Sequence, residues 1–511
     1  MFSRRHFIAG AAATAFAPAI LRAQSLWRNY PFSLGIAAGD PAPDGFVIWT
    51  RIAPEPLTPD GGMGIGVAPV KWEVASDDRF NQIVASGEAL ARPELAHSVH
   101  VEVTGLQPDR PYWYRFEIQS ERSIKGRART LPLPGGESPS LRFGVAGCQH
   151  YEEGYYAAFR HLAREDLAFV YHYGDYIYEY GGDALRPSFG GDLIQPVRQY
   201  EGRMLYDITD YRQRYAQTKM DADLQRAHAA HAFLVTMDDH EVENNWVGIL
   251  PQDDTPPEIF RLRRAQAFQA WYEHMPVRRS SLPRPDGITI HDHIRWGNLA
   301  SINLLDTRQF RSDQVCNDRW STPCQDVNAA NRTVLGSDQE AWLERNLAQG
   351  QARWNVLAQQ VMMMSLDRRT REEPEKFVNL DSWAGYETAR QRLLARMRGL
   401  NNVVVLTGDE HQNFAGLLHH RDQPVAVEFV ATSVSSGGNG QDLRPGSDRI
   451  LANNPQLKFI NDQRGYLTCE VTAEEWRTNY MVLDRVTSPD ATISKRATWA
   501  TTHGQPDLRQ V

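Results

Sequence analysis

Five apolar runs along the chain each end abruptly in polar residues that can hold a metal ion or an anionic group. Each run has the length and the β-branched content of a buried strand. In order, the runs are Leu141 to Gly147, Leu167 to Gly174, Phe233 to Met237, Ala300 to Leu305 and Val403 to Gly408. In open α/β sheets, ligands bind outside the carboxyl ends of the strands, so residues from all five ends can meet in one site.

Segments with helical signals separate these strand-like runs, which is typical of βαβ units. We expect helices over Tyr155 to Ala163, Pro257 to His274 and Ser337 to Leu347. In the third segment, Ser337 is followed three residues later by Glu340, which predicts a capping box. Residues 140–490 are therefore predicted to form an α/β domain. Residues 491–511 belong to a Thr-, Ser- and Pro-rich stretch and are expected to form an irregular tail.

Residues 31–134 show a different pattern, in which short strand-like runs alternate with Gly, Pro and Asp turns. The runs are Gly45 to Thr50, Val70 to Val74, Ser98 to Val103 and Tyr112 to Ile118. This spacing predicts a small all-β sandwich. The segment from Leu106 to Tyr114 resembles the turn and following strand of fibronectin type III-like domains. The Pro- and Gly-rich segment 131–136 is the predicted linker out of this domain.

The first 23 residues are typical of a twin-arginine signal peptide. Arg4 and Arg5 precede an Ala-rich apolar stretch and small residues suited to cleavage. A membrane anchor is the alternative, but the stretch is shorter than the roughly 20 residues that span a bilayer. We therefore expect export through the twin-arginine machinery to a periplasmic or secreted location. That route carries folded proteins, which suits a protein whose metal is loaded before export.

Charge and cysteine content narrow the class of protein. The net charge of −8 becomes more negative once the arginines of the signal are removed, so binding of nucleic acid through basic patches is not expected. A local metal charge can still attract an anionic substrate. Cys316 and Cys324 flank a loop-like segment that a disulfide can close in an oxidising compartment; two unpaired loop thiols are the alternative. Cys469 has the setting of a strand-core residue.

Three aspartates, Asp175, Asp239 and Asp409, each follow a predicted strand. Carboxylates brought together repel one another unless a cation lies between them, so the set predicts a metal site. Helix capping or turn hydrogen bonds are the alternative for any one of them. His411 lies two residues beyond Asp409, on the same side of an extended segment, and can reach the same ion or an adjacent one. His240 can either bind a metal or remain free as a general acid.

In order along the chain, these motifs resemble those of the PhoD-like alkaline phosphatases and phosphodiesterases, within the calcineurin-like metallophosphoesterases. The motifs are Gly147-Cys148-Gln149, Gly174-Asp175-Tyr176-Ile177-Tyr178-Glu179, Asp238-Asp239-His240-Glu241-Val242-Glu243-Asn244-Asn245-Trp246, Asp306-Thr307-Arg308-Gln309 and Gly408-Asp409-Glu410-His411. The resemblance implies an α/β fold: a four-layered αββα sandwich with metals at the strand ends, preceded by the all-β fibronectin type III-like domain.

The resemblance also implies a metal set of one ferric ion with calcium ions. At the positions that match the family motifs, the resemblance implies that the iron ligands are Cys148, Asp175, Tyr178 and Asp409. It implies that Asp239, Asn244, Asn245 and His411 complete the cluster around calcium. A thiolate and a phenolate suit ferric iron, whereas carboxylate and amide oxygens suit calcium. The alternative for Cys148 is a small buried hydrophobe. The chain departs from ordinary metallophosphoesterases, whose first motif is Asp-x-His, because Cys148 stands there and His150 is not spaced to replace that histidine.

The implied activity is metal-dependent hydrolysis of phosphate mono- and diesters, which releases phosphate for scavenging. We expect metal-activated water to attack phosphorus in line with the leaving group. His240 is the candidate general acid. Arg308 can steady a phosphate oxygen through its guanidinium fork, or it can form an ordinary salt bridge. Small esters are the expected substrates, with phospholipids or teichoic-acid-like polymers as larger candidates. Phospholipase D-like cleavage of headgroups and a non-catalytic extracellular binding protein are the alternatives.

Overall fold

The computed structural model describes residues 29–182, 186–187, 193–316, 320–349, 352–400 and 402–511. The predicted signal peptide, residues 1–23, lies outside this part of the chain. Among the described residues, no helix combines the length and apolar character needed to cross a membrane.

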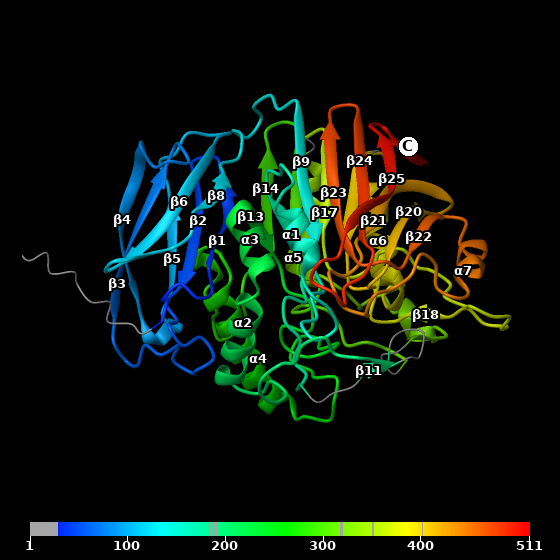
Figure 1. Ribbon diagram of the computed structural model, residues 1–511. Coiled ribbons are helices and arrows are strands. Elements are labelled where there is room, and N and C mark those ends of the chain that lie inside the picture. Colours follow the sequence, from blue (N-terminus) through cyan, green and yellow to red (C-terminus); the bar gives the residue numbers. More distant parts are fainter. Residues whose placement is uncertain (1–28, 183–185, 188–192, 317–319, 350–351, 401) are drawn as a thin grey trace, which may run out of the picture.

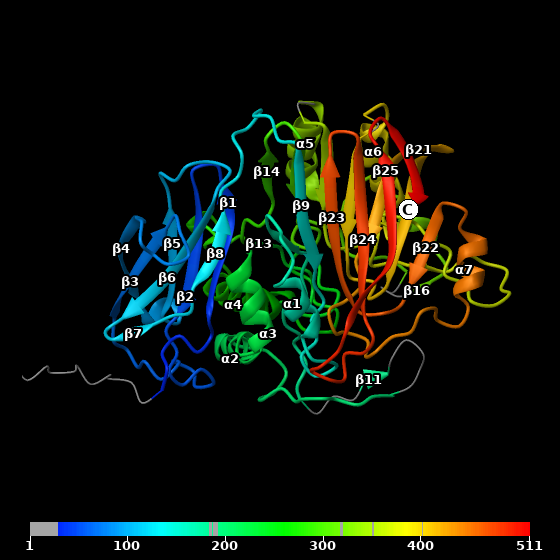
Figure 2. The ribbon, with the colours of Figure 1, turned by 45° about the horizontal axis from the view of Figure 1, so that its top comes forward.

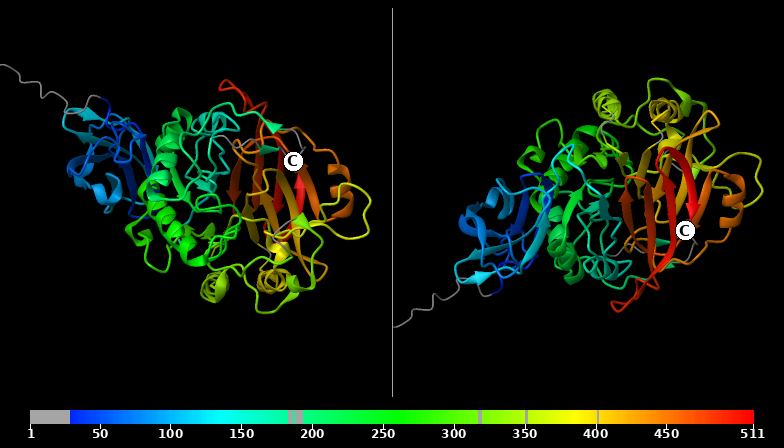
Figure 3. Two further views of the ribbon diagram at one scale, coloured as in Figure 1. Left: turned by 90° about the horizontal axis from the view of Figure 1, so that it is seen from below. Right: turned by 90° about the horizontal axis from the view of Figure 1, so that it is seen from above.

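Two large sheets pack face to face and form the centre of the fold (Figure 3). The first sheet has ten strands in the order β26-β25-β24-β23-β9-β10-β13-β1-β2-β5, and the second has seven in the order β14-β15-β17-β19-β21-β20-β22. Apolar side chains from both sheets, such as Phe143, Leu234, Val356 and Val404, form the core between them. Helices cover both outer faces, so the predicted αββα sandwich is confirmed.

The elements have the following bounds. In the first sheet, the strands are β1 (Ile36–Ala42), β2 (Gly45–Arg51), β5 (Ser98–Val103), β9 (Ser140–Ala146), β10 (Val170–His172), β13 (Ala232–Val235), β23 (Gly465–Thr472), β24 (Glu475–Leu483), β25 (Ile493–Thr502) and β26 (Gln505–Gln510). In the second, they are β14 (Asp292–Trp296), β15 (Ala300–Leu304), β17 (Trp354–Ala358), β19 (Val403–Thr407), β20 (Asn413–His420), β21 (Gln423–Val430) and β22 (Leu457–Asn461). The helices are α1 (Ala157–Leu162), α2 (Ile208–Lys219), α3 (Ala222–Ala230), α4 (Pro257–His274), α5 (Gly336–Ala348), α6 (Glu387–Met397) and α7 (Ser447–Asn453). Two short pairs, β11 (Arg186–Pro187) with β12 (Leu193–Ile194) and β16 (Trp320–Ser321) with β18 (Val378–Asn379), lie outside both sheets.

All five predicted strand runs are strands, and their order in the sheets explains how their ends meet. Strands β9, β10 and β13 are parallel neighbours in the first sheet. Strands β15, β17 and β19 are parallel neighbours in the second. Parallel neighbours bring their carboxyl ends to one edge, so the polar residues that follow β9, β10, β13 and β19 converge.

The N-terminal strands β1 to β8 form two layers around their own core (Figures 1 and 2). One layer contains β3 (Ala68–Ala75), β4 (Ile83–Ala91), β6 (Pro111–Ile118), β7 (Glu121–Arg122) and β8 (Gly126–Arg129). The other layer, β1-β2-β5, continues the ten-stranded sheet, because Ala38 of β1 pairs in parallel with Ala232 of β13. The local pattern predicted the sandwich strands but gave no sign of this shared sheet.

Two local predictions were wrong. The stretch expected to be an irregular tail forms β25, which pairs with β24, and β26, which pairs with β25. Its Thr residues are β-branched and favour a sheet, and Ala497 to Thr501 are buried. Helix α5 begins at Gly336, so Ser337 is not its cap. Thr333 accepts the Gly336 N–H instead (2.9 Å), and its hydroxyl donates to Glu340 (2.6 Å).

Candidate metal centre

The loops that follow β10, β13 and β19, together with residues of β16 and β18 and the loop after β18, line a cavity of about 210 Å³ at the carboxyl edge of the two sheets. Seven of the predicted site residues line this cavity. They are Asp175, Asp239, His240, Asn244, Asn245, Asp409 and His411. Cys148 and Tyr178 are buried against the same cluster, where they contact Asp175. The structure therefore brings together every predicted metal-binding residue.

Five of these residues have left-handed backbone conformations. The φ angles are 51° at Cys148, 55° at Asp175, 53° at Asn245, 65° at Asp409 and 51° at His411. Positive φ is uncommon for residues other than glycine and costs on the order of 1 kcal/mol each, so it persists only where the surroundings impose it. The sharp turn at each strand end directs these side chains toward one another.

The Glu241 carboxylate, which is fully buried, fixes two of these turns. Its oxygens accept the backbone N–H groups of Asp175 (3.1 Å), Tyr176 (2.6 Å) and Asp238 (2.9 Å). One side chain thus joins the loop after β10 to the loop after β13.

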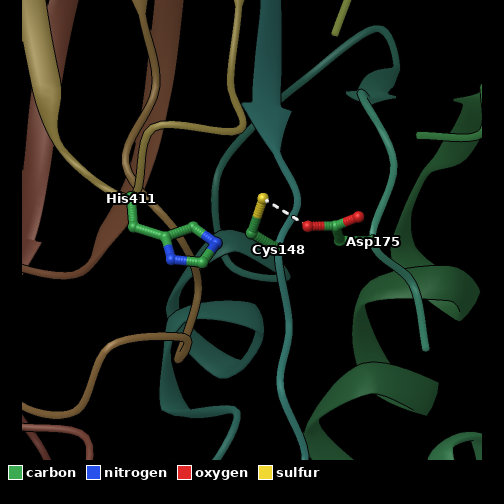
Figure 4. A group of neighbouring side chains, drawn as sticks. All are labelled: Cys148, Asp175 and His411. Atoms are coloured by element: carbon green, nitrogen blue, oxygen red, sulfur yellow. Dashed lines mark hydrogen bonds between the residues drawn. The ribbon is translucent and has the colours of Figure 1, made fainter. Parts of the chain in front are cut away.

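A thiol, a phenol and a carboxylate meet at the centre of the cluster. Oδ2 of Asp175 accepts hydrogen bonds from Sγ of Cys148 (3.2 Å) and from the hydroxyl of Tyr178 (3.0 Å). Nε2 of His411 lies 3.4 Å from that hydroxyl. Cys148 lies between His411 and Asp175, which come from different loops (Figure 4). Ligand atoms of these three residues lie within 4.8 Å of one another, close enough to share one ion.

Carboxylates dominate the adjoining part of the cluster. Asp238, Asp239 and Asp409 bring oxygens within 4.8 Å of one another, and Asp175, Asp239 and His240 form a second such group. Asp239 belongs to both groups and Asp175 also belongs to the thiol group, so the three groups are continuous. This arrangement has room for more than one cation.

The electrostatics of the cluster fit bound cations. Burial, reinforced by neighbouring carboxylates, raises the pKa of Asp175 and Asp409 well above the usual range. Burial and Asp175 likewise raise the pKa of the Cys148 thiol and the Tyr178 phenol. Anionic forms of all four groups therefore need a positive charge among them, which a metal ion supplies. Burial and Arg464 lower the pKa of His411 well below its usual value, which leaves a neutral imidazole able to bind metal.

His240 differs from His411 in its partners. Although burial alone would lower its pKa, the carboxylates of Glu179, Asp239 and Asp175 raise it well above the usual value. Nδ1 of His240 lies 2.7 Å from Oε2 of Glu179. A protonated His240 with its ring fixed in this way can donate a proton or a hydrogen bond into the cavity.

The two asparagines lie at the edge of the cavity, where the loop after β13 turns. The Asn244 N–H donates to Oε1 of Glu179 (2.9 Å), and the Asn245 N–H donates to Oδ2 of Asp239 (2.8 Å). Their backbones thus position the carboxylates beside His240. Both residues line the cavity, the Asn244 amide nitrogen donates to Gln252 (2.6 Å), and amide oxygens of this kind suit calcium.

The proposed contact of Arg308 with substrate is corrected by its surroundings. Arg308 is 1% exposed and does not line the cavity. Its Nε lies 2.6 Å from Asp238 and its Nη1 lies 2.8 Å from Asp381. These contacts favour the salt-bridge interpretation, since two carboxylates hold the guanidinium group away from the cavity; Nη2 lies 3.8 Å from Asp239.

Several residues of the cavity were not predicted. Asn379, Asp381, Glu410 and Trp320 line it, and Oγ of Ser436 lies 2.7 Å from the hydroxyl of Tyr178. Glu410 lies between Asp409 and His411 in one of the family motifs, so the sequence does carry a signal for it. Asn379 is the last residue of β18 and Asp381 follows two residues later; this strand has only two residues, and their sequence gives no strand signal.

The cysteines away from the cluster behave as expected. Cys316 and Cys324 form a disulfide, with their Cα atoms 5.8 Å apart. Cys469 is fully buried in β23.

Comparison with known proteins agrees with this geometry. Residues 143–480 match the family model of the PhoD-like phosphatase, and residues 16–132 match the model of its N-terminal domain. Alkaline phosphatase D from Bacillus subtilis (strain 168) is 46% identical over 528 residues, covering 100% of this chain and 89% of that protein.

Two solved structures share the fold. The structure of PhoD superposes with a TM-score of 0.91 at 46% identity, covering 95% of this chain and 93% of the other. The purple acid phosphatase PPD1 from yellow lupin (Lupinus luteus) seeds has a TM-score of 0.55 at 12% identity, covering 93% of this chain and 74% of that one. The second likeness concerns the fold alone.

Proposed function

The chain belongs to the PhoD-like phosphatases, a metal-dependent family of phosphoric ester hydrolases, and on that premise we propose that it uses ferric iron with calcium to hydrolyse phosphate mono- and diesters outside the cytoplasm. Cys148, Asp175, Tyr178 and Asp409 are the iron ligands in this proposal. Asp239, Asn244, Asn245 and His411 complete the cluster around calcium.

The observation that carries the proposal is the shared carboxylate oxygen of Asp175. A thiol and a phenol, which suit ferric iron and are poor ligands for calcium, both donate to this one atom. The carboxylate of Asp239 and the amides of Asn244 and Asn245 offer oxygen, which suits calcium. Donors suited to iron and donors suited to calcium thus lie side by side within one continuous cluster.

When bound, the ions supply Lewis-acid stabilisation of phosphoryl oxygens and lower the pKa of water to generate the nucleophile. The chain's own residues position the reacting groups. Glu179 orients His240 and keeps it protonated, so that its free Nε2 can donate a hydrogen bond to the phosphoryl group or a proton to the departing alkoxide. Arg308 holds Asp238 and Asp381 through its guanidinium group and fixes the orientation of the adjoining aspartates.

Export by the twin-arginine machinery is part of the proposal. The support is the Arg4-Arg5 motif with its apolar stretch, together with the Cys316–Cys324 disulfide, a bond that persists in oxidising compartments. A folded protein loaded with iron before export would retain that metal where calcium is abundant. A reporter fusion of residues 1–30 tests the route: replacing Arg4 and Arg5 with lysines should abolish export, and continued export would contradict it.

The substrates proposed are small phosphate esters, with phospholipids or teichoic-acid-like polymers as larger diesters of the same chemistry. Phospholipase D-like release of headgroups needs the same diester hydrolysis, so only substrate comparison separates it. The purified protein should hydrolyse para-nitrophenyl phosphate and bis(para-nitrophenyl) phosphate, and removal of calcium should abolish turnover. Absence of turnover with both esters after metal loading would contradict the proposal.

A further inference from the structure

A second, larger cavity lies beside the metal centre. It has a volume of about 810 Å³ and shares the side chain of Trp320 with the metal-binding cavity. Among the described residues, three arginines line it, Arg368, Arg444 and Arg464, together with one carboxylate, Asp462. The metal-binding cavity is rich in carboxylates, so the two cavities have opposite charge.

Residues that support the metal ligands also form the wall of the second cavity. Arg464 donates to the backbone carbonyl of His411, and Arg368 donates to the Glu410 carboxylate. Oγ of Ser436 lies 2.7 Å from the hydroxyl of Tyr178. The next two residues, Gly437 and Gly438, line the second cavity. A substrate whose phosphorus lies at the metal centre therefore has this cavity within reach of one ester arm.

The charges around the second cavity are not balanced by the residues that line it. Arg444 and Arg464 share one oxygen of Asp462, at 2.6 Å and 3.2 Å. Glu410 pairs with Arg368 from outside the lining. Glu153 does not line the cavity, and its carboxylate accepts the Gly437 N–H at 2.6 Å. Among the described residues, the lining therefore carries more cationic than anionic side chains, which attracts an anionic group.

Arg444 lies near a second arginine of the cavity wall. Burial, together with the neighbouring Arg368, lowers its pKa despite the attraction of Asp462. A carboxylate or phosphate bound by its guanidinium fork would reverse this destabilisation through charge-assisted hydrogen bonds.

The part of the wall that the two cavities share is the aromatic side chain of Trp320. The Trp320 side chain has the Arg368 guanidinium 5.1 Å from its ring and Phe377 at 6.4 Å between ring centroids. This surface can pack against the carbon chain of an ester arm on its way to the arginines.

We propose that the cavity lined by Arg368, Arg444 and Arg464 binds one ester arm of a phosphodiester substrate and selects arms that end in an anionic group. This inference rests on the proposed function, because it takes the scissile phosphorus to lie at the metal centre. The ligand chemistry is a carboxylate or a second phosphate at the end of a short carbon chain. Diesters with neutral arms are the poorer substrates of the same enzyme.

The test compares three para-nitrophenyl diesters whose second arm is butyl, 3-carboxypropyl or 3-phosphonopropyl, using the full-length metal-loaded protein. One charge-assisted contact corresponds to roughly a tenfold preference in kcat/KM, and we expect at least this for the anionic arms, mainly through KM. A higher value for the phosphonopropyl arm would assign the cavity to phosphate, and a higher value for the carboxypropyl arm would assign it to carboxylate.

Two variants test whether the preference for anionic arms arises in the second cavity. Arg444→Gln should reduce the anionic-to-butyl ratio several-fold toward one. Thr370→Glu, which adds a negative charge at an exposed position in the cavity wall, should reduce the same ratio without disturbing a buried residue. Arg396→Gln, an exposed arginine of α6 paired with Glu344, is the matched control and should retain the wild-type ratio.

The outcomes separate this inference from the proposed function. Turnover of all three diesters with equal kcat/KM would overturn the inference and leave the proposed function intact. A preference that survives in both Arg444→Gln and Thr370→Glu would also overturn it. Absence of turnover with all three would overturn the proposed function and the inference with it.

Discussion

Glu179 and His240 form a buried pair in which Oε2 of the carboxylate lies 2.7 Å from Nδ1 of the imidazole. Glu179 also accepts the Asn244 N–H (2.9 Å), so it is fixed on both sides. The arrangement leaves Nε2 as the free nitrogen of His240 and favours the protonated ring. In the proposed mechanism, this nitrogen acts as the donor.

Replacing Glu179 should therefore change the pH dependence of catalysis. Loss of the carboxylate removes the largest interaction that raises the pKa of His240, so the protonated form should be lost at lower pH. We expect Glu179→Gln to shift the alkaline limb of the kcat/KM profile by at least one pH unit toward acid, with metal content retained. An unchanged alkaline limb would show that His240 is not the titrating donor.

Arg308 should prove a positioning residue. Arg308→Met leaves Asp238 buried without its cation, whereas Asp381 keeps Arg311 at 3.2 Å, and loss of one partner of a buried pair typically costs about 3 to 5 kcal/mol. We expect a fall of this size in the free energy of unfolding measured in urea, together with weaker metal retention. Arg308→Lys keeps the positive charge but lacks the guanidinium fork. Its stability and metal retention should lie between those of the wild type and Arg308→Met. If Arg308→Met keeps wild-type stability and metal content but loses kcat, the guanidinium must act on substrate instead.

Lys219 gives a pH-dependent stability that is independent of the metal centre. Burial lowers the pKa of this lysine to about 7, with its ammonium 4.3 Å from the Trp49 ring centroid. Between pH 7 and its ordinary pKa of 10.5, the unfolded chain binds more protons than the folded chain, so this group makes stability rise with pH. The slope should be up to about 1.4 kcal/mol per pH unit.

Lys219→Met should therefore stabilise the protein most near pH 7, and the gain should shrink toward pH 10. Thermal unfolding at both pH values, with metals saturating, measures this difference. Lys71→Met, at an exposed position of β3, is the control and should show little gain at either pH. An equal gain for Lys219→Met at both pH values would contradict the lowered pKa.

The disulfide between Cys316 and Cys324 closes a loop that contains β16, and Trp320 of β16 lines both cavities. Its loop closure should contribute about 2 to 3 kcal/mol to stability. We expect the double variant Cys316→Ser, Cys324→Ser to lower Tm and to raise KM for bulky diesters more than it lowers kcat. Reduction of the disulfide in the wild type should reproduce both effects. An unchanged KM would show that this loop does not contribute to binding of bulky diesters.

The sequence predicted the fold class and the side chains that gather at the strand ends. The candidate ligands lie within a few residues of strand ends, so the local pattern singled out Asp175, Asp239 and Asp409, and the family motifs added Cys148 and Tyr178. Contacts between distant segments left no such local signal. Asp381 is 73 residues from Arg308, and the β1–β13 pairing joins Ala38 to Ala232. The error at residues 493–510 arose because Thr and Ser suit both loops and strands, and only pairing with β24 decides between them.

The most direct test of the central claim is the metal content and optical absorption of the folded protein, measured together for the wild type, Tyr178→Phe and Cys148→Ser. The account predicts about one iron per chain and a visible charge-transfer band that is lost or shifted in the two variants, because both side chains meet at Asp175. Zinc or manganese in place of iron, with no visible band in the active wild type, would contradict the assignment of Cys148 and Tyr178 as iron ligands.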